Sequence, residues 1–452
     1  MWWENKLMRT VRCRLKQKPG ILGHLLASIG DENGYLGEIK TVQMGRTSVI
    51  RDLVFFADDP LHMERLINVV HQTADVELLE VRDDVLEMHQ GGKIAMRSRY
   101  KINTLGQLRR VYTPGVAEVC MKIKEDPSLV QRFTSIPHMV AIVTDGSAVL
   151  GLGDIGAEAS MPVMEGKASL METFVGLSGI PILLDTKDPD KIVETVVNIA
   201  PTFSAIQLED ISAPRCFEIE NRLKEKLNIP VMHDDQHGTA VVVTAALMNA
   251  AKMADVDLHQ CRIGQIGLGA AGLAVSRMLM HFLDTSVLGT DLSVDAKNRL
   301  SDAGGRSSTL EEIMSTCDVV IATTGVPGLI KPHMVRKGQI VLALSNPKPE
   351  IEPKDALAQG ASFAADGKSV NNILGFPGIF RGAVDAGISN LTVEMYIAAS
   401  KAIAESAAPG ELVPSPLELN VHRRVAQDVA RTAMNLGVST KDLTRYFDVP
   451  TE

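Results

Sequence analysis

One glycine-rich turn constrains the fold of this chain more than any other feature. The turn, Gly267-Leu268-Gly269-Ala270-Ala271-Gly272, follows a predicted strand at 262–266 and opens a predicted helix at 273–283. A further strand, 286–290, ends at Asp291, 19 residues after Gly272. Such a turn lets phosphates approach a helix N-terminus, and the acid at that spacing accepts a hydrogen bond from a ribose 2′-hydroxyl. The pattern predicts a doubly wound Rossmann sheet with a dinucleotide site, whose candidate contacts are Gly267, Gly269, Ala270, Ala271, Gly272 and Asp291.

The same glycine pattern occurs earlier, at 151–156. There Asp154 places a negative charge where a pyrophosphate would bind, and Pro162 is expected to interrupt any helix that follows. We therefore assign the dinucleotide to the second turn. A glycine turn in an α/β domain that binds no nucleotide is the alternative for that turn as well.

Two apolar runs, 318–323 and 339–344, predict buried parallel strands. The loops after them carry Thr324 and Asn346, and Asn372 follows further along the chain. Ligands of doubly wound sheets bind outside the carboxyl ends of the strands. Thr324 and Asn346 are therefore candidates for cofactor contact, and Asn346 and Asn372 for substrate contact. Both asparagines also suit ordinary turns.

Residues 1–90 have a pattern of their own. The predicted elements are a strand at 11–15, a helix at 21–29, strands at 35–43 and 48–56, a helix after the N-cap Asp59, and a strand at 76–81. This βαββαβ order predicts a ferredoxin-like module. The turn at 18–22, KPGIL, resembles that of the ACT family of regulatory modules. The resemblance implies a small-molecule effector at a dimer interface, and a dimerisation module without a ligand is the alternative.

Two acidic clusters follow predicted strands. One is Glu209-Asp210, and the other is Asp234-Asp235 within the run 233–238. Carboxylates brought together repel each other unless a cation neutralises them, and oxygen ligands favour Mg²⁺ or Mn²⁺. The pair of clusters therefore favours a divalent metal site, although each cluster alone suits a solvated loop.

His233 and His237 are spaced like the histidines of a zinc peptidase helix. That interpretation is disfavoured because the run directly follows a proline-containing strand, and because Asp234 stands where the peptidase motif has Glu.

Lys167 lies in a predicted helix, in line with an apolar stripe formed by Leu170, Met171 and Phe174. A desolvated lysine has a lowered pKa and serves as a base. Alternatively, its stem is buried while its ammonium group reaches water. These residues alone leave both interpretations open.

The composition disfavours several other classes of protein. The chain has 46 Lys+Arg, 55 Asp+Glu and a net charge of −9, with 4% aromatic residues, so neither nucleic acid nor a membrane surface is an expected partner. No apolar run approaches a membrane span, and the N-terminus has no signal-peptide core. Five scattered Cys without a CxxC pair predict a reducing, cytoplasmic environment.

Eight segments taken in chain order resemble the malic enzyme family, in its smaller prokaryotic type. They are YTPGVA at 112–117, TDGSAVLGLGDIG at 144–156, PVMEGKA at 162–168, LEDISAPRCFEIE at 208–220, IPVMHDDQHGTA at 229–240, GLGAAG at 267–272, SNPKPE at 345–350 and NNILGFPGIFRGA at 371–383. The resemblance spans about 95–405. It implies oxidative decarboxylation of malate to pyruvate and CO₂ with NAD, or NADP, and a divalent cation, Mg²⁺ or Mn²⁺.

The resemblance also implies roles for individual residues. Tyr112 corresponds to the catalytic acid and Lys167 to the base, with Asp234 supporting the lysine or the substrate. The implied metal ligands are Glu209, Asp210 and Asp235. Asn346 and Asn372 correspond to substrate-contacting asparagines.

Two departures from the family pattern leave contacts unassigned. Ala148 stands where the larger, animal-type enzymes carry an arginine for a substrate carboxylate. The segment 366–370 is also shorter than its usual counterpart.

The expected domains are an ACT-like module at 1–90, a substrate and metal domain at 93–237, a Rossmann domain at 238–385 and a helical tail at 386–452 that packs on the substrate domain. A homodimer or higher oligomer is expected. Because Asp291 repels a 2′-phosphate, we expect NAD to be preferred over NADP. Two other functions stay open: an effector-regulated amino-acid dehydrogenase, which needs no divalent metal, and a catalytically silent effector-binding protein on the same scaffold.

Overall fold

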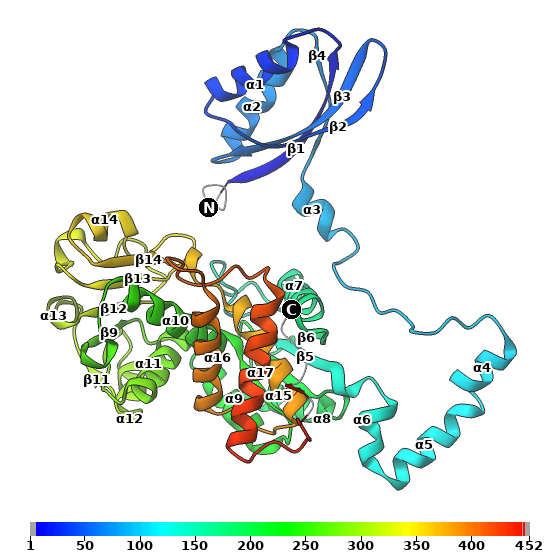
Figure 1. Ribbon diagram of the computed structural model, residues 1–452, viewed down its shortest axis with the longest axis vertical. Coiled ribbons are helices and arrows are strands. Elements are labelled where there is room, and N and C mark those ends of the chain that lie inside the picture. The colour runs from blue at the N-terminus through cyan, green and yellow to red at the C-terminus, as the bar shows by residue number, and fades with distance from the viewer. Residues whose placement is uncertain (1–5, 445, 448–452) are drawn as a thin grey trace. The chain divides into compact units, whose positions relative to one another are not determined.

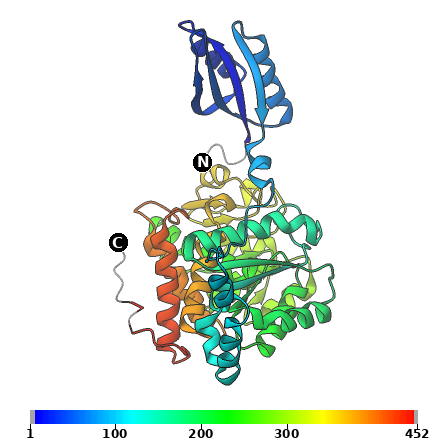
Figure 2. The same cartoon turned by 90° about the vertical axis from the view of Figure 1, so that its right-hand side faces the viewer.

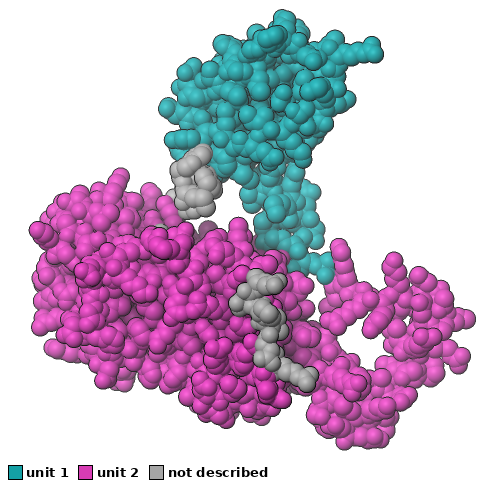
Figure 3. Space-filling view, viewed as in Figure 1, with its two compact units in different colours: residues 1–95 teal, residues 96–452 magenta. Residues whose placement is uncertain are grey.

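The computed structural model describes residues 6–444 and 446–447. The chain divides into two compact units, 1–95 and 96–452, which are coloured separately in Figure 3.

The first unit has the predicted βαββαβ order, followed by one short helix. Its elements are β1 (Leu7–Lys16), α1 (Ile21–Asp31), β2 (Tyr35–Met44), β3 (Ser48–Ala57), α2 (Pro60–Gln72), β4 (Val76–Arg82) and α3 (Asp84–His89). The strands form an antiparallel sheet of order β2-β3-β1-β4. Helices α1 and α2 cover one face of it, as Figures 1 and 2 show.

The sequence pattern explains this packing. Val11, Cys13 and Leu15 alternate along β1 and are buried against the two helices, as predicted. Asp59 caps α2 by accepting a hydrogen bond from the His62 N–H, and Pro60 occupies the first helical turn, which confirms the predicted start of that helix.

The second unit begins with helices and then builds a parallel sheet of order β6-β5-β7-β8. Its elements to this point, with η for a 3₁₀ helix, are α4 (Leu105–Val111), α5 (Gly115–Glu125), η1 (Pro127–Leu129), α6 (Val130–Phe133), η2 (Ile136–His138), β5 (Met139–Thr144), α7 (Ala157–Val175), β6 (Ser178–Leu183), α8 (Pro189–Ile199), η3 (Ala200–Thr202), β7 (Ala205–Leu208), α9 (Arg215–Lys226) and β8 (Val231–His233). Helices α8 and α9 pack against each other and contribute to the core of this sheet.

The predicted interruption at Pro162 is wrong, because α7 runs through this proline. Proline costs one backbone hydrogen bond near the start of a 19-residue helix. Met164, Ala168 and Met171 are buried along the same helix, which packs against β6. We attribute the unbroken helix to this packing.

The second sheet of this unit is also parallel, with the order β11-β10-β9-β12-β13-β14. Its elements are η4 (Leu258–Gln260), β9 (Ile263–Ile266), α11 (Ala270–Leu283), β10 (Leu288–Thr290), α12 (Val294–Asp302), β11 (Arg306–Ser307), α13 (Leu310–Thr316), β12 (Val319–Ala322), η5 (Pro332–Met334), β13 (Ile340–Ala343), α14 (Pro353–Ala358) and β14 (Phe363–Asp366). The strand order reverses beside β9, the arrangement of a Rossmann sheet, as the glycine turn predicted.

Long helices connect and cover the two sheets. They are α10 (Asp234–Met253), α15 (Phe376–Ala386), α16 (Val393–Ser406) and α17 (Leu419–Asn435). Two short 3₁₀ helices, η6 (Gly367–Ser369) and η7 (Asn372–Leu374), precede α15. Helix α10 packs on α11 and α16, while α15 and α17 pack on each other and on α7. Among the described residues, no helix combines the length and apolarity required to cross a membrane.

Candidate active site

Four carboxylates meet where two neighbouring strands end. Glu209 and Asp210 directly follow β7, and Asp234 and Asp235 directly follow β8. The two strands are parallel neighbours with Leu208 paired to His233, so the acidic clusters start side by side. Ligand oxygens of Glu209, Asp210 and Asp235 all lie within 4.8 Å of one another. The sequence prediction that these clusters lie at strand ends is confirmed.

Burial dominates the electrostatics of this carboxylate cluster. It raises the pKa of Asp210 to about 9, with the charges of Asp235 and Glu209 adding to the effect. It also raises the pKa of Glu209 to about 7, although Lys167 beside it acts in the opposite direction. The pKa of Asp235 is raised to about 6, again chiefly by burial. The cluster therefore holds its negative charge at a considerable cost in free energy.

These residues fit a divalent cation. Asp210 Oδ2 is buried and has no hydrogen-bond partner among the described residues. Such an atom is costly unless it binds a donor or an ion. Glu209, Asp210 and Asp235 offer oxygen ligands only, which is the donor set that Mg²⁺ and Mn²⁺ prefer. These three residues could hold such an ion.

Lys167 extends from α7 into this cluster. Its Nζ lies 2.5 Å from Asp234 Oδ2 and 3.0 Å from Glu209 Oε1, above the ring of Phe376. The side chain is 10% exposed and its ammonium group pairs with both carboxylates, which disfavours the alternative in which that group reaches water. Burial by itself lowers the pKa of Lys167, but the carboxylates of Asp234 and Glu209 raise it well above the usual value for lysine. The expected lowered pKa is therefore wrong.

Asn372 joins the cluster, whereas Asn346 belongs to the loop after β13. Asn372 Nδ2 donates to Asp234 Oδ2 at 2.8 Å, although 138 residues separate the two. Asn346 Nδ2 lies 3.4 Å from the carbonyl oxygen of Gly367. Asn346 therefore lies in the loop after β13, and Asn372 lies at the start of η7.

The predicted dinucleotide turn joins β9 to α11. Gly267 has φ of +88°, a conformation that favours glycine. A side chain on Gly272 would bring its Cβ 1.9 Å from the Gly267 carbonyl oxygen, so only glycine fits. Asp291 Oδ2 accepts from the Leu268 N–H at 2.7 Å, which places this acid against the turn. Thr324 lies near the same turn, since a Cβ on Gly267 would be 3.1 Å from Thr324 Cγ2.

The earlier glycine turn, 151–156, precedes α7. Its Asp154 forms an ion pair with Lys187, which holds the pKa of that carboxyl below its usual value. Asp154, whose negative charge disfavours a pyrophosphate at this turn, is thus paired with Lys187.

Tyr112 is exposed, whereas Lys167 and the carboxylates around it are buried. It ends α4 and is 68% exposed. In the described part of the chain, α4 and α5 bury none of their residues. The structure of a single chain therefore does not bring the predicted acid to Lys167.

The two histidines of the zinc peptidase alternative belong to different elements. His233 ends β8, and His237 lies on α10 with Nε2 2.9 Å from Glu220 Oε1. The same carboxylate accepts from the His233 N–H and from Gln236 Nε2. His237 is thus occupied by a buried carboxylate, which argues against a zinc-binding helix.

No role was assigned to Arg215 from the sequence. Arg215 donates from one guanidinium nitrogen to Asp145 Oδ2 and Ser147 Oγ, both at 2.9 Å. Ala148, the next residue after Ser147, donates its N–H to the Asp210 carbonyl oxygen at 2.9 Å. Arg215 therefore lies beside the position where the larger family members carry an arginine. Its place in the quoted segment 208–220 was the only signal in the sequence.

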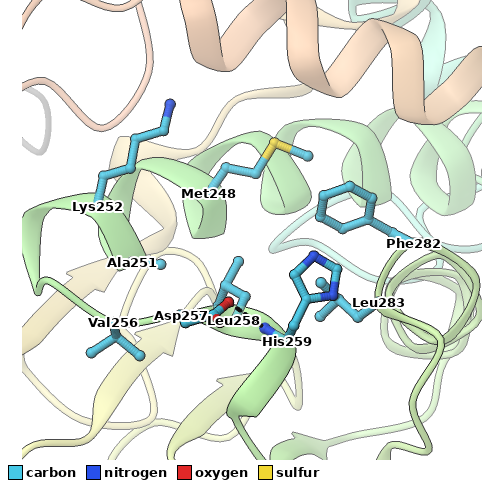
Figure 4. Close-up of a pocket in the computed structure, with 9 residues that line it drawn as sticks. All are labelled: Met248, Ala251, Lys252, Val256, Asp257, Leu258, His259, Phe282 and Leu283. Atoms are coloured by element: carbon cyan, nitrogen blue, oxygen red, sulfur yellow. Dashed lines mark hydrogen bonds between the residues drawn. The ribbon is translucent and has the colours of Figure 1, made fainter.

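A separate hollow lies between the end of α10, η4 and the end of α11 (Figure 4). Met248, His259 and Phe282 line it, with the rings of His259 and Phe282 6.2 Å apart. The hollow is mainly apolar and contains none of the predicted site residues.

A Rossmann sheet with a dinucleotide turn, together with a buried lysine among carboxylates, defines a nicotinamide-dependent dehydrogenase. Comparison with known families agrees. The model "Malic enzyme, N-terminal domain" matches residues 93–224, and "D-isomer specific 2-hydroxyacid dehydrogenase, NAD binding domain" matches 230–328.

Relatives and solved structures point to the same family. NAD-dependent malic enzyme 1 of Bacillus subtilis is 53% identical over 95% of this chain and 98% of its own length. NAD-dependent malic enzyme of Geobacillus stearothermophilus is 40% identical over 96% of each chain. The crystal structure of malic enzyme from Pyrococcus horikoshii is 39% identical, covers 80% of this chain and 92% of that one, and has a TM-score of 0.75. The chain belongs to the malic enzyme family of decarboxylating oxidoreductases.

Proposed function

We propose that this chain catalyses the metal-dependent oxidative decarboxylation of malate to pyruvate and CO₂, with NAD as the preferred hydride acceptor. The observation that carries the proposal is the buried contact of Lys167 with Asp234 and Glu209, within a carboxylate cluster at the strand ends. The dinucleotide turn on the neighbouring sheet supplies the place for the hydride acceptor.

Glu209, Asp210 and Asp235 hold the divalent cation in this proposal. When bound, the cation polarises the substrate oxygens and neutralises the charge of the cluster. Gln207 supports the first of these ligands, because its Nε2 donates to Glu209 Oε2 at 2.5 Å. Asp235 in turn accepts from the Asp210 N–H at 2.9 Å, which couples the two strand ends.

Lys167 accepts the proton of the C2 hydroxyl as hydride leaves for NAD. A lysine acts as a base only after it has lost a proton, and Asp234 Oδ2, 2.5 Å away, is the acceptor for that proton. Asn372 holds the same carboxylate oxygen from the other side. After CO₂ leaves, Tyr112 donates its phenol proton to C3 of the enolate, and the proton that Lys167 took from the C2 hydroxyl then returns to Tyr112.

Asn346, Asn372 and Arg215 bind the substrate in this proposal. Malate is a dianion, so the carboxylate that does not approach the metal requires a cation. Lys167 is already matched by two carboxylates, whereas Arg215 uses one nitrogen for Asp145 and Ser147. Arg215 Nε is buried and has no hydrogen-bond partner in the described part of the chain. A guanidinium group binds carboxylates with two parallel hydrogen bonds.

The active unit is a homodimer or a higher homo-oligomer in which Tyr112 reaches the Lys167 of a second copy. Leu105, Leu108 and Val111 of α4 are exposed at 79%, 41% and 44%, next to the exposed Tyr112. Apolar side chains in such a row are typical of an interface. A second copy that covers them would also complete the site.

Residues 1–90 serve as a ferredoxin-like, ACT-type regulatory module in this proposal. The support is the βαββαβ order, with the sheet order β2-β3-β1-β4. The proposed domains of the remaining chain are those expected from the sequence: substrate and metal at 93–237, cofactor at 238–385 and a covering helical tail at 386–452. The effector stays unnamed, and the cytoplasmic location stays a prediction.

The first test is a spectrophotometric assay with malate, Mn²⁺ and NAD⁺ or NADP⁺. We expect malate- and Mn²⁺-dependent NADH formation with stoichiometric pyruvate. Oxidation of an amino acid without a divalent metal would favour the amino-acid dehydrogenase instead. Binding of an effector without turnover of either substrate would favour the catalytically silent protein.

The second test mixes two inactive variants, Tyr112→Phe and Lys167→Ala. If Tyr112 acts in a second copy, random hybrids of a dimer contain one intact site in half of the molecules, and about a quarter of wild-type activity returns. If Tyr112 acts within its own chain, mixing restores none.

A further inference from the structure

The carboxylate of Glu350 is fully buried, at 0% exposure. Glu350 is the last residue of the segment 345–350, which follows β13, and the proposed mechanism gives it no role. A buried carboxylate is costly unless donors match its lone pairs. The donors that match Glu350 come from two different loops of the Rossmann sheet.

One oxygen of Glu350 binds the loop after β12. Oε1 accepts from the Thr324 N–H at 2.6 Å and from Thr324 Oγ1 at 2.8 Å. The backbone follows the same path, since Ile330 N–H donates to the Glu350 carbonyl oxygen at 3.0 Å. The end of β12 is thereby tied to the segment that follows β13.

The same carboxylate also binds Ser345, at the start of the loop after β13. Ser345 Oγ lies 2.5 Å from Oε1, and the Ser345 N–H donates to Oε2 at 3.3 Å. Ser345 Oγ in turn accepts from the Gly325 N–H at 2.7 Å. Glu350, Ser345 and Thr324 thus form one closed network that joins both loops.

Each loop carries a residue with a proposed role in ligand binding. Thr324 lies near the dinucleotide turn, and Asn346 follows Ser345 directly. Glu350 accepts hydrogen bonds from both the N–H and the hydroxyl of Ser345. It therefore fixes the backbone at the residue immediately before Asn346. This network therefore sets the distance between the loop after β12, which carries Thr324, and the side-chain amide of Asn346.

We propose that Glu350 is a positioning residue that holds the loops after β12 and β13 together, so that Asn346 presents the substrate to the nicotinamide. The inference rests on the proposed oxidation of malate. Glu350 itself, being fully buried, acts through Ser345 and Thr324. Hydride transfer depends steeply on the alignment of donor and acceptor, so a small movement of Asn346 has a kinetic effect.

The test compares three variants with the wild type: Glu350→Gln, Ser345→Ala and the double variant. In Glu350→Gln, the amide oxygen keeps the contacts with Thr324, while the amide nitrogen faces the Ser345 N–H, which is also a donor. Ser345→Ala removes the hydroxyl that links Gly325 to Glu350. Glu352→Gln is the matched control, because Glu352 is exposed and its side chain does not cap α14.

Four quantities are measured for each protein: KM for malate, kcat, the deuterium isotope effect on kcat/KM with malate deuterated at C2, and the dissociation constant of NADH without malate. We expect each single variant to raise KM for malate about tenfold and to raise the isotope effect, since hydrogen bonds to a buried carboxylate are among the stronger ones. NADH binding is expected to change less than about twofold, because the contacts with Thr324 persist. The double variant is expected to show less than the sum of the two single effects, because both act on one network.

Thermal unfolding separates positioning from a merely structural role. If the variants lose stability but keep the wild-type KM and isotope effect in their folded fraction, the positioning role is refuted. Equal kinetics in all three variants and the control refute it as well. Failure of the wild type to oxidise malate refutes the proposed function itself, and that result is visible before any variant is made.

Discussion

The strongest quantitative prediction concerns the pH dependence of metal binding, because it follows from the burial of Asp210. In the metal-free protein the pKa of this carboxyl is raised to about 9, chiefly by burial and then by the charges of Asp235 and Glu209. A metal ion binds the carboxylate form only, so binding must release the proton. Metal affinity should therefore rise with pH, up to the pKa of the group.

The magnitude follows from the distance between that pKa and neutral pH. At pH 7, two units below about 9, roughly one Asp210 in a hundred is ionised, which corresponds to about 3 kcal/mol of lost binding free energy. The apparent Kd for Mn²⁺ should fall about tenfold for each unit of pH between about 6.5 and 8.5. Glu209, with a pKa of about 7, should steepen the slope at the acidic end.

The assay is titration of Mn²⁺ followed by electron paramagnetic resonance, without substrate, at a series of pH values. Asp210→Asn is the informative variant, since its amide cannot titrate: it should bind Mn²⁺ more weakly than the wild type at high pH, and with a shallower pH dependence. Asp190→Asn, an exposed acid on α8, serves as the control and should follow the wild type. A flat profile in the wild type, or the wild-type slope in Asp210→Asn, would show that Asp210 is not the proton-linked ligand.

Three further predictions use steady-state kinetics. Lys167→Ala should lower kcat at least about 100-fold while NADH binds normally, and more than about a tenth of wild-type turnover would remove its role as base. Asp291→Ser should raise kcat/KM with NADP⁺ relative to NAD⁺ at least tenfold, because the variant no longer repels the 2′-phosphate; each pair of like charges at about 4 Å costs about 4 kcal/mol at an effective dielectric near 20. Equal kcat/KM for the two cofactors in the wild type, or no gain with NADP⁺ in the variant, would show that Asp291 does not set the cofactor preference. Arg215→Ala should raise KM for malate at least about tenfold with a smaller change in kcat, and Arg215→Lys should recover part of the loss; an unchanged KM would remove Arg215 from the substrate site.

Local patterns predicted the elements of the fold well. The alternation of Val11, Cys13 and Leu15, the Asp59 cap and the glycine turn each appear in the structure where the sequence placed them. Each depends on residues within a few positions, so the sequence alone contains the necessary information. Pro162 shows the limit of such rules, because a local preference was outweighed by the packing of the helix that contains it.

The chemistry of the candidate site was only partly visible in the sequence. The acidic clusters were found because both follow strands, and parallel strands end at the same edge of a sheet. The pKa of Lys167 could not be predicted from the sequence, because it depends on Asp234, which lies 67 residues away. Glu350 was quoted within a segment without a role, because its partner Thr324 lies 26 residues earlier on another loop.

The sequence by itself determined which residue types are present and the period at which they recur, and therefore the strands, the helices and the glycine turn. Only the tertiary structure decided which carboxylates share a site, that Lys167 is enclosed by them, and that Tyr112 is exposed in a single chain. The physical reason is that burial and charge act through space. The free energy of an ionised group depends on every neighbour within a few ångströms, and the fold brings those neighbours from distant parts of the chain.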